Sequence, residues 1–127
     1  MKKLSLFLIL LTALVVSACE SFPGEYYVRY DITYPFYNKD RDINLRYTIR
    51  TESDLETIKG SQKVTRTIGP VSKGFRAHVE MLYGDPIYST IMVSVAEGEG
   101  SFVVCAIGSE KVDYRVGDPH KQYRGDI

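Results

Sequence analysis

YYVRYDITY, residues 26–34, is the stretch that decides the fold. Its even positions hold large apolar or aromatic side chains: Tyr26, Val28, Tyr30, Ile32 and Tyr34. Its odd positions hold Tyr27 and three polar residues. Successive side chains of a β-strand point to opposite faces, so this alternation predicts a half-buried strand whose even positions face the core. Pro35 ends the pattern.

The same signal repeats along the chain. Further alternating or β-rich runs occupy residues 43–50, 63–68, 75–83, 87–95, 101–107 and 112–116. Clusters of Gly, Pro, Asn and Asp separate them, as turns require. This spacing predicts an all-β fold, a single antiparallel β-sandwich of about seven strands, Ig-like, over residues 25–117. A polar tail is expected at residues 118–127.

Two stretches leave alternatives open. Ser53–Glu56 matches the S-x-x-E capping box, but only about one helical turn fits before Gly60, and a short edge strand or a loop fits equally well. Residues 101–107 are apolar on both parities. That pattern predicts a strand covered on both sides, or one buried near a chain end.

The beginning of the chain has a different character. A start with two lysines precedes an apolar run, residues 4–16. The run is shorter than the roughly 20 residues that span a bilayer, so it predicts a signal peptide over residues 1–18. The run ends at Val16-Ser17-Ala18-Cys19, and residues 19–24 predict a short tether.

Val16-Ser17-Ala18-Cys19 resembles the lipobox of bacterial lipoproteins. The resemblance implies cleavage before Cys19, a diacylglycerol on its sulfur, and an amino group open to acylation. Two or three acyl chains anchor a protein firmly, whereas one gives marginal binding. Glu20 is not the Asp associated with inner-membrane retention in enteric bacteria, so the expected location is the outer membrane, facing the periplasm or the cell surface.

The β part is similar to the small Ig-like envelope lipoproteins of Bacteroidetes and, more loosely, to the small accessory proteins of mycobacterial lipid exporters. Five short motifs carry the similarity: Tyr-x-Val-x-Tyr at 26–30, Tyr-Thr at 47–48, a Gly-led strand at 74–79, Ile-x-Val at 91–93 and Val-x-Tyr-x-Val at 112–116. The similarity implies an Ig-like fold and a place in the cell envelope.

Charge and cysteine content limit the function classes. The chain has 16 basic and 16 acidic side chains; removing residues 1–18 takes away two basic ones and leaves a net charge of about −2. Nucleic-acid binding is therefore not expected, since it favours a basic excess. The cysteines are Cys19 and Cys105. If Cys19 carries lipid, Cys105 has no intramolecular partner, and a disulfide framework is excluded.

Isolated reactive residues do not assemble into a predicted catalytic or metal site. Cys105 lies in an apolar run without His or Asn nearby in the sequence, which favours a buried structural thiol. His78 lies on the polar parity of its strand and His120 in the tail, so both are expected to be solvated. A zinc site would need Cys or carboxylate partners at ligand spacing. No cofactor is expected.

Other polar motifs have simple interpretations. The carboxylate pairs at Asp40 and Asp42 and at Glu97 and Glu99 lie in turn sequences and are expected to form turns. Arg124-Gly125-Asp126 spells the tripeptide that integrins recognise. A match of only three residues arises by chance in many sequences, so no integrin binding is expected. The sequence therefore predicts a protein without enzymatic activity.

Aromatic residues are the strongest candidates for binding. Six fall within residues 26–37: Tyr26, Tyr27, Tyr30, Tyr34, Phe36 and Tyr37. Most are expected to fill the core of a domain that has no Trp. Phe36 and Tyr37 follow Pro35 in a loop, and with Tyr88 they form the predicted binding surface, because loop aromatics are frequent anchors of interfaces.

Two hypotheses for function follow. The first is a lipid-anchored envelope component, held to the membrane through Cys19, that acts as a non-enzymatic interaction or accessory protein for another envelope protein. The second is a module that binds a glycan or small ligand through the aromatic loop near Phe36 and Tyr37. The tether places Glu25 near the bilayer, so binding loops are expected at the opposite end.

Overall fold

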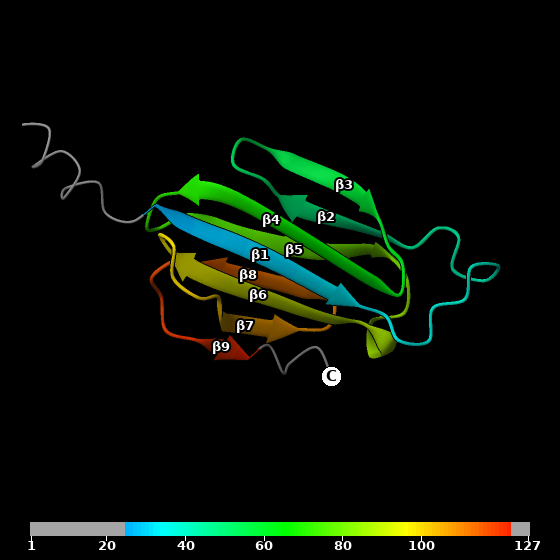
Figure 1. Ribbon diagram of the computed structural model, residues 1–127. Helices are drawn as coiled ribbons and strands as arrows, with labels where there is room; N and C mark the ends of the chain where they lie inside the picture. The colour runs from blue at the N-terminus through cyan, green and yellow to red at the C-terminus, as the bar shows by residue number, and fades with distance from the viewer. Residues whose placement is uncertain (1–24, 123–127) are drawn as a thin grey trace, which may run out of the picture.

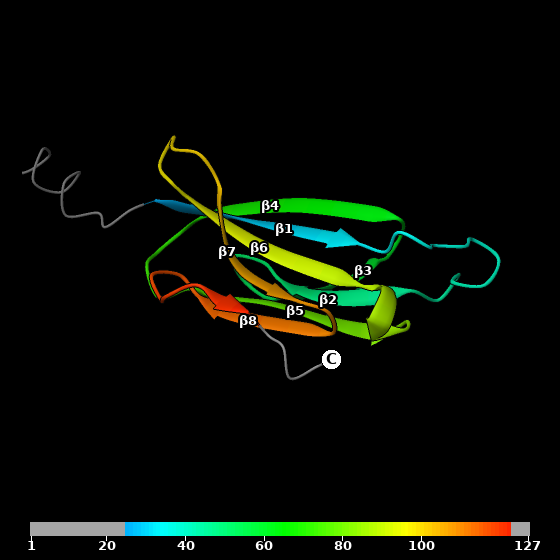
Figure 2. The same cartoon turned by 90° about the horizontal axis from the view of Figure 1, so that it is seen from below.

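The computed structural model describes residues 25–122, which form two β-sheets packed face to face (Figures 1 and 2). The expected all-β sandwich is confirmed. The predicted signal peptide, Cys19, the tether and the Arg124-Gly125-Asp126 motif lie outside the described residues.

Sheet A has five strands in the order β4-β1-β6-β7-β9. Their bounds are β1 Tyr26–Thr33, β4 Lys63–Val71, β6 Thr90–Glu97, β7 Val103–Gly108 and β9 Lys121–Gln122. The pairs are antiparallel except β7 with β9, which is parallel.

Sheet B has four antiparallel strands in the order β3-β2-β5-β8. Their bounds are β2 Arg46–Arg50, β3 Leu55–Lys59, β5 Arg76–Tyr83 and β8 Lys111–Arg115. One turn of 3-10 helix, η1 (Pro86–Tyr88), lies between β5 and β6. Among residues 25–122, no helix is long and apolar enough to cross a membrane.

The core lies between the sheets and follows the predicted alternation. Val28, Tyr30, Ile32 and Tyr34 are at most 2% exposed, and Tyr26 packs against them partly buried. The Tyr30 hydroxyl donates a hydrogen bond of 2.7 Å to the Arg50 carbonyl in the opposite sheet. The Tyr30 ring thus bridges the two layers, with its hydroxyl group satisfied by the main chain.

The structure has nine strands over the described residues, two more than expected. The open alternative at Ser53–Glu56 resolves as a turn into β3, because Thr51 donates through its backbone N–H and Oγ1 to the Asp54 carbonyl. The second addition, β9, lies in the expected tail. Two residues of parallel pairing are too short to leave a periodic signal.

Several strand ends differ from expectation. β2 begins at Arg46, and Ile43, expected inside, is 54% exposed, because residues 38–42 close a turn in which Asp42 Oδ2 accepts from the Asn38 N–H at 3.0 Å. β4 continues through Pro70 to Val71, which an edge strand tolerates. β6 begins at Thr90 because η1 occupies the residues before it.

The expectation that residues 101–107 are covered on both sides is wrong. Val103 and Val104 are 52% and 39% exposed. Pairing slips between Val93 and Ser94 of β6, so one residue of β7 is left over and both Cys105 and Ala106 turn inward. A β-bulge, and not burial of both faces, explains apolar residues on both parities.

One ion pair joins the two sheets along an open edge of the sandwich. Arg66 of β4 binds Glu56 of β3 with two hydrogen bonds, of 3.1 and 3.0 Å. Hydrogen bonding to the guanidinium lowers the pKa of Glu56. Both residues occupy inward positions of edge strands, where a charged pair can meet solvent at one side.

Candidate functional site

Two loops that are far apart in sequence meet at one end of the sandwich. β1 runs from Tyr26 at one end to Thr33 at the other, where residues 34–45 and η1 lie (Figure 1). The chain turns at Tyr34, whose N–H donates to the Gln62 carbonyl at 2.9 Å and whose carbonyl accepts from Tyr37 at 3.0 Å. This turn leaves Phe36 at its corner, 68% exposed.

Local sequence also fixes η1. Asp85 caps it: its Oδ1 accepts from the Ile87 N–H at 3.2 Å, and Pro86 occupies the first position of the helix, where no N–H is needed. The Asp85 N–H donates to the Tyr34 hydroxyl at 3.3 Å, which ties this turn to the end of β1. Ile87 and Tyr88 are thereby presented at the surface, 79% and 40% exposed.

Three aromatic rings form a continuous contact across the two loops. The Tyr88 ring lies edge-to-face against Tyr34, with centroids 6.0 Å apart, and against Phe36, with centroids 5.8 Å apart. Such pairs add about 0.5–1.5 kcal/mol beyond the area they bury. We call the exposed residues Phe36, Ile87 and Tyr88 the aromatic end.

A buried hydrogen bond in the core fixes the loop that carries Tyr88. The hydroxyl groups of Tyr47 in β2 and Ser89 are 2.9 Å apart, and both residues are almost fully buried. Burial raises the pKa of Tyr47 to about 12, so its phenol stays protonated and can hydrogen-bond at neutral pH. Ser89 follows Tyr88 directly, so the core holds the loop in one position.

The structure brings together two of the three predicted binding residues. Phe36 and Tyr88 are exposed and in contact. Tyr37, expected to be an exposed loop aromatic, is partly buried and packs against the core instead. Ile87 was missed because residues 87–95 read as one strand. The signal that could have found it is Asp85-Pro86, a cap followed by Pro at the first helical position.

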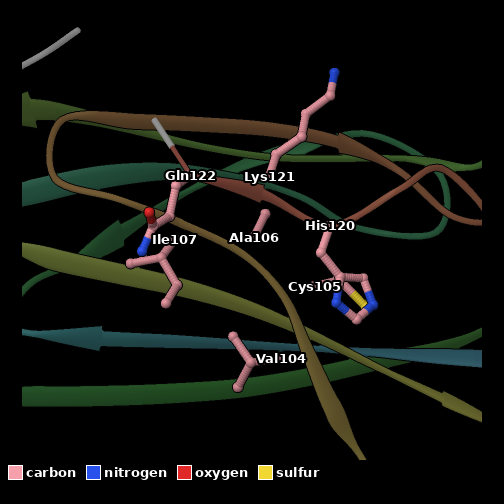
Figure 3. A pocket seen from close by; sticks show the side chains of 7 residues that line it. All are labelled: Val104, Cys105, Ala106, Ile107, His120, Lys121 and Gln122. Atoms are coloured by element: carbon pink, nitrogen blue, oxygen red, sulfur yellow. The ribbon is translucent and has the colours of Figure 1, made fainter. Parts of the chain in front are cut away.

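A second hollow lies at the edge formed by β7 and β9. A shallow cavity of about 320 Å³ is lined by residues of both strands and by His120, which precedes β9: Val104, Cys105, Ala106, Ile107, His120, Lys121 and Gln122 (Figure 3). Cys105 is buried, as expected, and its thiol lies 3.3 Å from the Val103 carbonyl. His120 is exposed, also as expected.

The hydroxyl of Tyr114 interacts with Cys105, one of the residues that line this cavity. It donates to the Asp118 carbonyl at 2.6 Å, and burial together with a hydrogen bond to Cys105 raises its pKa to about 12. The thiol and the phenol are therefore part of the packing between β7 and β8. Residues 25–122 contain no group of three His, Cys, Asp or Glu that could hold a metal ion.

The remaining predicted residues lie apart from both places. His78 is half-buried on the outer face of sheet B, with Nδ1 3.9 Å from Asp113 Oδ1. Asp40 and Asp42 take part in the turn hydrogen bonds at Asn38, in agreement with their interpretation as turn formers.

No protein-family model, curated protein or solved structure matches this chain, so the aromatic end is characterised by its geometry alone.

Proposed function

We propose that this protein is a lipid-anchored component of the cell envelope that binds a partner protein through its aromatic end and catalyses no reaction. The observation that supports this most is the contact between Phe36 and Tyr88, two exposed rings from loops about fifty residues apart in sequence. Exposed aromatic anchors on a rigid frame are typical centres of protein interfaces.

The hydrogen bonds that hold the two loops in place reduce the entropic cost of binding a partner. Hydrogen bonds from Asp85 to Tyr34 and between Tyr47 and Ser89 hold both loops. Less side-chain and loop ordering is then needed on association, so more of the burial energy contributes to affinity. Phe36 and Ile87 each remain more than two-thirds exposed and would lose most of that surface against a partner.

The anchor part of the proposal rests on the lipobox-like sequence at residues 16–19. The tether expected at residues 19–24 would reach at most about 20 Å, at roughly 3.5 Å per extended residue. Residue 25 lies at the end of the sandwich opposite to the aromatic end (Figure 1). The aromatic end therefore stays accessible to a partner when the other end is held at a membrane.

Site-specific photo-crosslinking in intact cells tests the proposal. A photoreactive residue at Ile87 should trap a defined partner band, and the band should be lost in Phe36→Ala/Tyr88→Ala. The same probe at Tyr27, on the outer face of sheet A, is the control. Equal labelling from both positions, or no band from Ile87, would contradict the proposal.

A second candidate is glycan binding at the same end. It is favoured by polar groups beside the exposed ring of Phe36: the Gln62 amide donates to the Pro35 carbonyl at 3.4 Å, and the Asp85 carboxylate caps η1. A glycan-array screen, followed by thermal shift with any hit, separates the two, because a ligand at 100 times its Kd adds about 2.7 kcal/mol of stability.

A further inference from the structure

The outer face of sheet B carries a strong local excess of positive charge. Six basic side chains point outward from its four strands: Arg46, Arg50, Lys59, Arg76, Lys111 and Arg115. Two acidic side chains, Glu80 and Asp113, share this face. We call these six residues the basic face.

The charge on this face contrasts with the rest of the molecule. The other described residues hold seven basic and twelve acidic side chains. The mature chain as a whole is close to neutral, so the six residues create a positive field on one side of a molecule that is otherwise negative. Such an asymmetry steers and orients a protein toward negatively charged surfaces.

Cross-strand pairing makes the arrangement costly for folding. Arg46 lies directly opposite Lys59, and Arg76 directly opposite Arg115. Like charges in directly opposed positions destabilise a sheet. Asp113 relieves part of the second pair, with its Oδ2 2.7 Å from Arg76. An external anion would relieve both pairs.

On the outer face of sheet A, by contrast, Arg29 has a partner of opposite charge within the protein. Arg29 is paired with Asp31 at 2.9 Å, and Asp31 also accepts from Thr65 at 2.9 Å. The Arg29 guanidinium further stacks on the Phe102 ring, 4.6 Å from its centroid. The charge of Arg29 on sheet A is thus satisfied within the protein, whereas on the outer face of sheet B six basic side chains share two carboxylates.

The broad shape of the basic face and the exposed apolar side chains beside it favour a membrane as the binding surface. The outer surface of a sheet is broad, and Figure 2 shows β2, β5 and β8 as the layer remote from β1 and β4. Leu55, Leu82 and Tyr83 lie on the same side and are 53%, 47% and 65% exposed. Basic residues mixed with Leu and Tyr suit a bilayer interface, where cations meet phosphates and apolar groups enter the headgroup region.

We propose that the basic face docks on a membrane surface rich in anionic phospholipids. The sandwich would then lie on its side, with sheet B against the headgroups and sheet A facing away. The aromatic end would point along the membrane plane, toward a partner in the same membrane. The docking itself does not depend on the aromatic end.

Fluorescent probes on the full chain reconstituted in vesicles test the docking. Thr57→Cys on β3 reports from the outer face of sheet B, and Thr67→Cys on β4 reports from that of sheet A; both are exposed residues of edge strands. Each carries an environment-sensitive dye, and the unsubstituted chain sets the labelling background. In phosphatidylglycerol vesicles at low salt, the dye at 57 should enter the headgroup region and the dye at 67 should not.

Charge reversal supplies the matched variants. Lys59→Glu/Arg115→Glu should release the dye at 57, lowering the ratio of docked to undocked protein by about fivefold for each basic side chain removed. Lys39→Glu/Lys63→Glu, with the same charge change outside sheet B, should leave the ratio almost unchanged. High salt should act like the first variant.

Three results would overturn the proposal. The first is equal signals from the two dyes. The second is the same signal in phosphatidylcholine vesicles as in phosphatidylglycerol vesicles. The third is protection of the dye at 57 by a soluble polyanion such as heparin but not by vesicles, which would assign the face to an acidic polymer instead.

Discussion

Buried tyrosine hydroxyls connect the core to the loops at the scale of single residues. Tyr30, Tyr47 and Tyr114 are each at most 2% exposed, and each hydroxyl has a partner: the Arg50 carbonyl, Ser89 and the Asp118 carbonyl. A chain without Trp uses these rings to fill its core. The hydroxyl of Tyr30 joins the two sheets, and those of Tyr47 and Tyr114 fix loop positions that apolar side chains would leave loose.

Alkaline pH should therefore unfold the protein. Burial raises the pKa of Tyr30, and it raises those of Tyr47 and Tyr114 to about 12. Unfolded tyrosine loses its proton near pH 10, so above that pH the unfolded state binds fewer protons and stability falls, by about 1.4 kcal/mol per pH unit for each tyrosine. Below about pH 10 this stability is fully present.

Denaturant unfolding followed from neutral pH to about pH 12 measures this effect. Tyr47→Phe removes one ionisable group, so the variant should lose stability more slowly with rising pH. It should also start from lower stability, because the buried Ser89 hydroxyl loses its partner. A free energy of unfolding that stays constant through this range would show that the phenols are accessible in the native state.

Glycine determines how the elements meet beside the aromatic end. Gly84 ends β5 with φ +141°, and a Cβ there would lie 2.5 Å from Leu45 Cδ1. The turn into Asp85 and η1 begins at this glycine, so the same residue sets both the close packing of Leu45 and the position of Tyr88.

Gly84→Ala should therefore be strongly destabilising. Overpacking together with a left-handed backbone should cost about 3 kcal/mol. Gly98→Ala is the matched control: its φ is +58°, nothing lies within 4 Å of its Cβ, and it should cost only about 1 kcal/mol. Thermal melts of both variants give the comparison, and equal losses would show that Leu45 moves aside freely.

The like-charge pairs of sheet B lead to a prediction about how strand pairing affects stability. Lys59→Glu/Arg115→Glu converts the pairs with Arg46 and Arg76 into pairs of opposite charge. The variant should gain about 1 kcal/mol at low salt and lose this gain at high salt.

Urea midpoints at two salt concentrations measure the gain. Lys39→Glu/Lys63→Glu should show no comparable increase, since Lys63 lies opposite Thr33. A destabilised double variant would mean that the cations do not repel one another. Stabilisation combined with loss of membrane docking would show that the basic face is retained for binding rather than for folding.

Sequence alternation accounts for most of the architecture of the whole molecule. Strict alternation at residues 26–34 and in β5 predicted the sandwich and much of its core, because each of these strands has one buried face. The failures have physical causes. A bulge at Cys105, opposite Val93 and Ser94, changed the parity of β7; η1 replaced the start of a strand; and β9 is too short to carry a pattern.

The candidate site was only partly predictable for a related reason. A loop position identified Phe36, and Tyr88 was identified only as an aromatic residue near the start of an expected strand; exposure depends on how a turn packs. Tyr37 sits one residue from Phe36 and faces the core. The basic face was not visible from composition, because net charge averages over surfaces that the fold separates.

Binding through the aromatic end is the central claim, and the most direct measurement is co-purification from envelope membranes of the full chain and two variants. Phe36→Ala/Tyr88→Ala should lose the partner by at least tenfold, since two interface anchors are worth more than about 1.4 kcal/mol together. Val103→Ala/Val104→Ala, which removes exposed apolar groups from β7, should keep it. Equal recovery of the partner with both variants, each folded and anchored as the parent, would contradict the account.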